Sequence, residues 1–345
     1  MIRRPAPALA SIVLAGAVLL AVGADLASKP ATVLEGPIKP RVTAIAVAFD
    51  RDNPKQKTFG KLTYRGGFNL FANSRHFGGY SGLAIDASGT TILAVSDGGT
   101  WMRASLDYNG RLLQGVHDMT LGPILGPNGK PLRKGKDRDA EGLALASGDT
   151  RNGEAYVSFE RVHRIARYPF SPKRFGPPSR TVKLPKAARQ MKTNQGLEAV
   201  ALIRAGRLTG TIVAFSERLK DSRGNLKGWL IGGPSPGTIT VRRLGGFDIT
   251  DAAGLPDGGL ILLERRFRYS EGVQMRIRRI KAADLRPGKL IAGEILLEAT
   301  DRLNIDNMEA VAVHRSRGGE TILTLMSDDN FNPLQRSLIM QFALP

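Results

Sequence analysis

A short unit that recurs five times along the chain constrains the fold more than any other feature of the sequence. Its clearest copy is the run 195–202, followed by a polar turn and the run 211–218. In four copies an acidic residue stands where the first apolar run begins, and in all five another acid stands where the second run ends. The units start at residues 81, 141, 198, 251 and 309, in steps of 60, 57, 53 and 58 residues. Self-similarity at such a spacing predicts an array of supersecondary units.

The length of the unit indicates which array this is. A unit of about 57 residues has room for four strands of the usual five or six residues with their turns. Residues 41–71, completed by 337–342, would supply a sixth unit. We therefore predict an all-β fold, a six-bladed β-propeller with a central channel, in which radial repetition leaves only short sheet edges. The alternative is a β-sandwich with accidental similarity between strands, which the parallel placement of the acids disfavours.

The N-terminus carries the pattern of an export signal. Arg3 and Arg4 precede an apolar stretch at 8–22, which ends in the small residues 22–24. Such a basic, apolar and small-residue order is typical of a signal peptide. The apolar stretch is also shorter than the roughly 20 residues that span a bilayer.

We therefore expect residues 1–24 to be a signal peptide, 25–40 a linker and 41–345 the propeller domain. This predicts a periplasmic or secreted protein, a monomer, with no stable membrane span after cleavage. An uncleaved anchor is the alternative, and the sequence does not distinguish Sec from twin-arginine export.

The charge balance predicts an anionic partner. The chain has 50 Lys and Arg against 31 Asp and Glu, a formal net charge of +19. Such a field attracts phosphate esters, acidic polysaccharides, anionic lipids or nucleic acids, although a solvated basic surface would have the same composition. The chain has no cysteine, which excludes disulfides, thiolate nucleophiles and Cys-ligated metals.

The acids of the repeat predict a metal site. In an antiparallel hairpin the start of the first strand and the end of the second lie at the same end. Propeller symmetry would then gather these acids at one mouth of the central channel, and the same reasoning places Asp251 and Glu264 there. Carboxylates brought together repel each other unless they are protonated, paired or bridged by a cation, and Ca²⁺ prefers such oxygen ligands. The predicted metal ligands are Glu141, Glu160, Glu198, Glu217, Glu309 and Asp328. Solvated acidic turns are the alternative.

An arginine directly follows three acids of the repeat, namely Glu160, Glu217 and Glu264. These arginines are Arg161, Arg218 and Arg265. Arginine binds phosphate and carboxylate groups in a bidentate manner, so these residues are candidates for holding an anionic substrate. The alternative is structural, with each arginine paired to a carboxylate of the neighbouring blade.

The sequence offers few catalytic candidates. Ser81 takes the place of the first acid in the first unit, and His76 lies just upstream. The match to G-x-S-x-G at 233–237 contains two prolines and precedes a β-like run, which is unlike a nucleophile elbow. The histidines have no zinc-ligand spacing. The run 265–269 mixes bases and aromatics, but we expect no nucleic-acid partner for an exported protein.

Four stretches of the repeat resemble the bacterial phytase-like family, which is also described as having esterase-like activity. They are residues 78–85, 92–99, 139–144 and 195–199. The resemblance extends over residues 70–340 and implies an exported propeller that acts on ester or phosphate-ester bonds. Calcium-dependent β-propeller phytases are similar in architecture, with six blades and an acidic channel. Their lysine and calcium-site motifs have no residue-by-residue match here.

Together these features predict a hydrolase of small anionic ester or phosphate-ester substrates that uses Ca²⁺ at the acidic mouth. The alternative is a non-catalytic periplasmic propeller that binds an anionic envelope ligand or a partner protein, since fold does not imply function. A lactonase-like metal propeller would differ mainly in substrate. The sequence does not choose between these ester classes.

Overall fold

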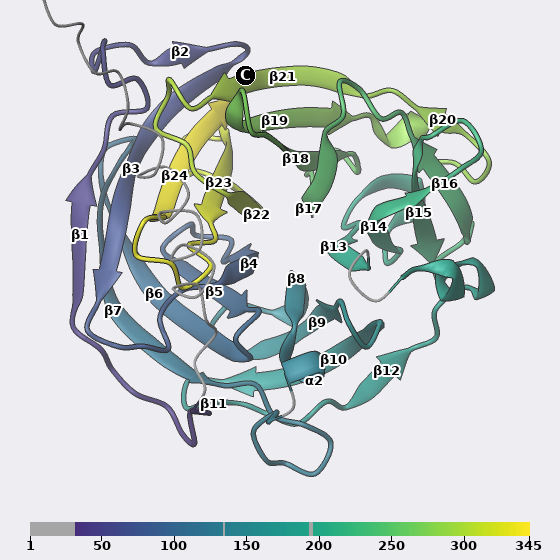
Figure 1. The fold of residues 1–345 in the computed structure, drawn as a ribbon, viewed down its shortest axis with the longest axis horizontal. Helices are drawn as coiled ribbons and strands as arrows, with labels where there is room; N and C mark the ends of the chain where they lie inside the picture. The colour runs from purple at the N-terminus through teal and green to yellow at the C-terminus, as the bar shows by residue number, and fades with distance from the viewer. Residues whose placement is uncertain (1–31, 134, 193–195) are drawn as a thin grey trace, which may run out of the picture.

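The computed structural model describes residues 32–133, 135–192 and 196–345. The strands of this part of the chain form five sheets, arranged radially around a common axis (Figure 1). The predicted signal peptide lies outside the described residues. Residues 32–40 of the predicted linker run along the outside of the ring, where Ile38 pairs with Leu121.

Each sheet has one innermost strand from the sequence repeat. These strands are β4 (Tyr80–Ile85), β8 (Ala140–Gly148), β13 (Leu197–Leu202), β17 (Asp248–Gly254) and β22 (Met308–Arg315). Each contacts the next innermost strand, and β22 contacts β4, so the ring is closed. The all-β propeller prediction is therefore confirmed.

Blades 1 to 4 follow the chain outward from these strands, except that the outermost strand of blade 3, β20, comes from the segment between two strands of blade 4. Blade 1 continues with β5 (Thr91–Ser96), β6 (Thr100–Asn109) and β7 (Leu112–Pro123). Blade 2 continues with β9 (Gly153–Phe159), β10 (Arg164–Ser171), β11 (Arg174–Phe175) and β12 (Arg180–Val182). Blade 3 continues with β14 (Ile212–Lys220), β15 (Leu226–Ile231), β16 (Gly237–Val241) and β20 (Leu290–Ile291). Blade 4 continues with β18 (Leu260–Arg268), β19 (Gly272–Ile280) and β21 (Glu294–Thr300). The described helical segments are short: α2 (Gly135–Arg138), η1 (Lys186–Gln190), η2 (Gly206–Leu208) and η3 (Ala282–Asp284).

The prediction of six blades was wrong, because both ends of the chain join the fifth repeat. Blade 5 has the order β1-β3-β24-β23-β22, with β2 against β3. Its further strands are β23 (Thr321–Ser327), β24 (Ser337–Leu344), β3 (Leu62–Ala72), β1 (Val42–Ala46) and β2 (Thr58–Phe59). The fifth repeat itself contributes only the hairpin β22–β23. It is completed outward by the C-terminal β24 and the N-terminal β3, which the sequence analysis had assigned to a separate blade.

Every innermost strand carries a β-bulge near its start. The register of its pairing shifts at Tyr80/Gly82, Ala140/Leu143, Leu197/Ala199, Ile249/Asp251 and Met308/Ala310. A bulge leaves one residue without a ladder partner and re-aims its side chain. The repeat therefore redirects one side chain per blade at the same end of the ring.

Below the bulges the axis of the ring is apolar and narrow. Ala84, Ala144, Ala201, Ala253 and Ala312 each lie three residues after the bulge position. They line an axial cavity of about 90 Å³ together with their neighbours on the same strands. Polar chemistry is therefore concentrated at the bulged end, which we call the mouth.

Candidate functional site

The mouth is built from two sets of five side chains that share positions in the blades. The bulge set consists of Ser81, Glu141, Glu198, Thr250 and Glu309. The end set lies where the second strand of each blade reaches the mouth and consists of Asp97, Glu160, Glu217, Arg265 and Asp328. In four blades the backbone N–H of the end residue donates to the carbonyl two residues before the bulge residue, at Gly79, Asp139, Gly196 and Asn307. In blade 4, Arg265 pairs with Asp248 at the same position.

In blade 4 the two mouth positions each lie one residue away from the acids that the sequence predicted there. Asp251 and Glu264 were expected at the mouth, but Thr250 and Arg265 occupy those positions. Since side chains alternate between faces of a strand, a shift of one residue moves a side chain to the other face. Asp251 and Glu264 are accordingly fully buried. The shift arose because the distal turn of this blade is short, which allowed the acids to be matched in the wrong register.

Both displaced acids serve the fold. The carboxylate of Asp251 accepts hydrogen bonds from the backbone N–H groups of Ala252 and Val311, both at 2.8 Å, and thereby joins β17 to β22. Glu264 forms a buried ion pair with Arg278, and Arg276 lies 3.8 Å away. Burial raises the pKa of both carboxyl groups, while these hydrogen bonds and arginines lower it.

The mouth contains two sets of three carboxylates, and the members of each set lie close enough to share a cation. Ligand atoms of Asp139, Glu141 and Glu160 lie within 4.8 Å of one another, and so do those of Glu160, Glu198 and Glu217. Glu160 belongs to both sets of three. Their donors are all carboxylate oxygens, which suit hard cations such as Ca²⁺. Four of the six predicted ligands are thus brought together.

The other two predicted ligands, Glu309 and Asp328, lie close to this cluster in blade 5. The charge of Glu309 acts on Glu141, Glu198 and Asp328. An Oε atom of Glu309 accepts a hydrogen bond from Asn307 at 2.9 Å and lies 3.3 Å from Arg265. Asp328 accepts a hydrogen bond from the backbone N–H of Asn330 at 2.6 Å.

The predicted ligand set omitted two acids. Asp139 belongs to the first of the two sets of three carboxylates. The charge of Asp97 acts on Glu141 and on Asp328. Asp97 could have been found from the repeat, since it stands where Glu160 and Glu217 stand in blades 2 and 3. It was missed because its unit has Ser81 in place of the first acid.

The crowding of carboxylates favours their protonated forms. Burial raises the pKa of Glu141, Glu198 and Asp328 well above the usual range, and the neighbouring carboxylates raise it further. Burial also raises the pKa of Glu160, and it raises that of Glu217 to about 7 although Arg218 opposes the shift. The crowding therefore favours protonation of the cluster or the binding of a cation that replaces the protons.

The three predicted anion-binding arginines lie at the rim of the mouth, each beside an acid. Arg161 pairs with Asp139 at 2.8 Å, and Arg218 pairs with Glu217 at 2.8 Å. Two of the three arginines also link neighbouring blades, as the structural alternative expected: Arg265 lies 3.3 Å from Glu309, and Arg218 lies 3.8 Å from Asp248. Arg161 and Arg218 remain exposed, so an anion at the mouth could still reach them.

The two catalytic candidates are not joined by a hydrogen bond within the described part of the chain. Ser81 is buried in the bulge of β4, and its hydroxyl group has no hydrogen-bond partner there. His76 is half-buried, and desolvation together with Arg75 and Arg138 lowers its pKa. A catalytic role for either residue stays a prediction.

Several solved structures are similar to this chain at low sequence identity. The RRP9 WD40 repeats share 11% identity and a TM-score of 0.37, over 83% of this chain and 77% of theirs. A gluconolactonase from Xanthomonas campestris shares 11% identity and a TM-score of 0.41, over 91% of this chain and 97% of its own. A search of curated protein sequences gave no match. No helix in the described residues is long and apolar enough to cross a membrane.

The family comparison is specific. The family model "Phytase-like: Esterase-like activity of phytase" matches residues 75–331, which include all five innermost strands and every residue of the mouth. The chain therefore belongs to the phytase-like family.

Proposed function

We propose that this protein is a hydrolase of ester or phosphate-ester bonds that works at the mouth with a bound divalent cation, in the first instance Ca²⁺. The observation that carries the proposal is Glu160, whose carboxylate is shared by two clusters of ligand atoms. A bound cation would polarise the ester and activate water.

The chain's own residues have separable roles in this proposal. Asp139, Glu141, Glu160, Glu198 and Glu217 hold the cation. Arg161 and Arg218 are exposed beside this cluster and orient the anionic group of the substrate.

We further propose that the protein acts outside the cytoplasm as a monomer. Support comes from the signal-peptide pattern at residues 1–24, which precedes the propeller in the sequence.

The test combines metal analysis with an ester panel. Purified protein is assayed on aryl phosphates and aryl acyl esters with and without a chelator, and Ca²⁺ binding is measured by calorimetry. We expect chelator-sensitive turnover of one ester class. Glu160→Gln should lower Ca²⁺ affinity at least about tenfold, since it removes a charged ligand from both sets of three.

Glu154→Gln is the matched control, because Glu154 lies on the same blade, away from the mouth, paired with Arg167. It should leave both readouts unchanged. Turnover that survives chelation would contradict the role of the cation, and no turnover on either panel would contradict the hydrolase. If no ester is turned over but Ca²⁺ binding still depends on Glu160, the protein is a cation-binding propeller without hydrolase activity.

A further inference from the structure

The most exposed apolar side chains of the described residues lie on the mouth face. Tyr269 is 87%, Leu334 82% and Phe267 61% exposed, more than any other large hydrophobic residue of the described chain. Phe267 and Tyr269 are at the tip of the β18–β19 hairpin, and Leu334 is in the connection from β23 to β24. Both connections follow an end-set residue, so both leave the ring at the mouth.

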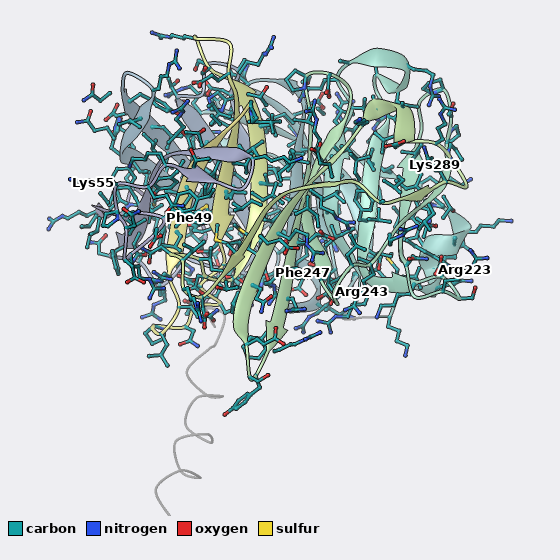
Figure 2. All side chains as sticks on the ribbon, turned by 90° about the horizontal axis from the view of Figure 1, so that it is seen from above. Phe49, Lys55, Arg223, Arg243, Phe247 and Lys289 are labelled. Atoms are coloured by element: carbon teal, nitrogen blue, oxygen red, sulfur yellow. The ribbon has the colours of Figure 1, made fainter. Side chains whose placement is uncertain are left out.

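The β18–β19 hairpin is built to project. β18 continues three residues past Arg265, which is about 10 Å of strand. Its base is held by Arg266, which donates to the carbonyl of Gly245 and to the side chain of Gln274, both at 2.6 Å. The guanidinium of Arg266 also lies 5.0 Å from the ring centroid of Phe247. Figure 2 shows this hairpin extending beyond the face that carries Phe247. The aromatic tip is thus held away from the body instead of folding back on it.

The mouth-side connections of blades 2, 3 and 4 carry exposed basic side chains. They are Arg161, Arg218, Lys220, Arg223 and Arg268. Arg161, Arg218 and Arg268 each also pair with an acid, but together with the net charge of +19 these exposed bases favour an anionic surface. Near an anionic bilayer each such residue contributes about 1 kcal/mol of attraction.

The distribution of the apolar residues favours a lipid surface over a protein partner. The tips belong to separate connections of two neighbouring blades and surround the polar mouth, so they do not form one contiguous apolar patch. A fluid interface accommodates separate tips, and aromatic residues with arginine and lysine are the residues enriched at membrane–water interfaces.

We propose that the mouth face docks on an anionic phospholipid bilayer, with Phe267, Tyr269 and Leu334 among the headgroups and the exposed bases against lipid phosphates. The proposal does not rest on cation binding or on hydrolase activity, although the surface shares Arg161 and Arg218 with the proposed substrate site.

The test places a fluorescent reporter at the tip of the full-length protein. Tyr269→Trp adds an exposed tryptophan, whereas the native Trp101 and Trp229 are buried. With vesicles of brominated phosphatidylcholine and phosphatidylglycerol in equal parts, we expect quenching and a blue shift of the new tryptophan. Both effects should weaken with added salt or with phosphatidylcholine alone.

Leu112→Trp is the matched control, because Leu112 is 46% exposed at the start of β7, at the opposite end of the ring. The apolar stretch 8–22 is present in both variants and could bring either to vesicles. Only docking through the mouth face quenches the tip tryptophan and spares the one at 112. Equal quenching of the two, or none at position 269 in low salt, would overturn the proposal.

A loss-of-function pair completes the test. Adding Phe267→Ser and Leu334→Ser to the Tyr269→Trp protein should weaken vesicle binding about tenfold or more, since two large apolar side chains no longer enter the interface. Adding Leu112→Ser should not. Unchanged binding of the double variant would also overturn the proposal.

Discussion

At the scale of single residues, the mouth is a set of carboxylates whose neighbours raise their pKa values. Glu217 is the clearest case, because burial raises its pKa from the ordinary 4.5 to about 7. Asp248 and Glu160 add to the shift, while Arg218 and Arg265 oppose it. Its proton is therefore held more tightly in the folded protein than in the unfolded chain.

This shift predicts how stability changes with pH in the absence of a cation. A raised folded-state pKa contributes stability that is complete below about pH 4.5 and is lost as the pH rises through 7. With a chelator present, the free energy of unfolding should therefore increase as the pH falls from 8 to 5. Glu217→Gln should flatten this dependence and raise the free energy of unfolding at pH 8 by about 1–3 kcal/mol.

Denaturant titrations at several pH values measure this effect. Glu154→Gln should follow the wild-type curve, because Glu154 lies outside the cluster. If Glu217→Gln destabilises the chelated protein at pH 8, the carboxylate is needed there as an anion and the interpretation is wrong.

At the scale of elements, the bulges and the strand register decide what each acid does. The bulge set points into the mouth, whereas Asp251, one residue after a bulge, bonds the backbone of the adjacent innermost strand. A carboxylate stands at the bulge position in three blades and at the next position in blade 4. Their places on the strand separate a candidate ligand from a structural link between blades 4 and 5.

Asp251 should therefore matter for stability and not for cation binding. Asp251→Ala leaves two buried N–H groups without an acceptor and should lower the free energy of unfolding by about 2–4 kcal/mol. Asp251→Asn keeps one acceptor oxygen and should cost less. Asp284→Ala is the control, because the half-buried Asp284 pairs with the exposed Lys289 at the surface, and it should have little effect. A loss of Ca²⁺ affinity in well-folded Asp251→Asn would contradict this assignment.

At the scale of the whole molecule, the ring is closed by strands from both ends of the chain. β3 lies between β1 and β24, so blade 5 forms only when residues 62–72 and 337–344 meet. At this seam Gly67 pairs with Met340, and an added Cβ would lie 2.8 Å from the carbonyl oxygen of Ile339.

Gly67→Ala should weaken the seam. The contact forces the two backbones apart, and we expect the free energy of unfolding to fall by about 1–3 kcal/mol. Gly318→Ala is the matched control. Apart from its two chain neighbours, the atom nearest to its added Cβ would be Ser316 Oγ, at 3.8 Å. Denaturant unfolding compares the two. Equal stability of both variants would show that the seam tolerates the extra atom.

The repeat in the sequence was sufficient to predict a propeller with acids at one mouth. Both follow from local rules: alternating apolar runs form strands, and antiparallel pairing brings the start of one strand to the end of the next. Four of the six predicted ligands accordingly lie in the two sets of three carboxylates. They are Glu141, Glu160, Glu198 and Glu217. The composition also established a basic chain without cysteine.

Only the tertiary structure decided the number of blades and the register of blade 4. Strand pairing between the chain ends is a long-range choice, and nothing local tells whether β3 and β24 form a blade or complete one. Likewise, a register differing by one residue changes the sequence pattern little, yet it moves Asp251 and Glu264 from the mouth into the core. Local patterning thus determines which elements form, while packing around the closed ring determines which side chains meet.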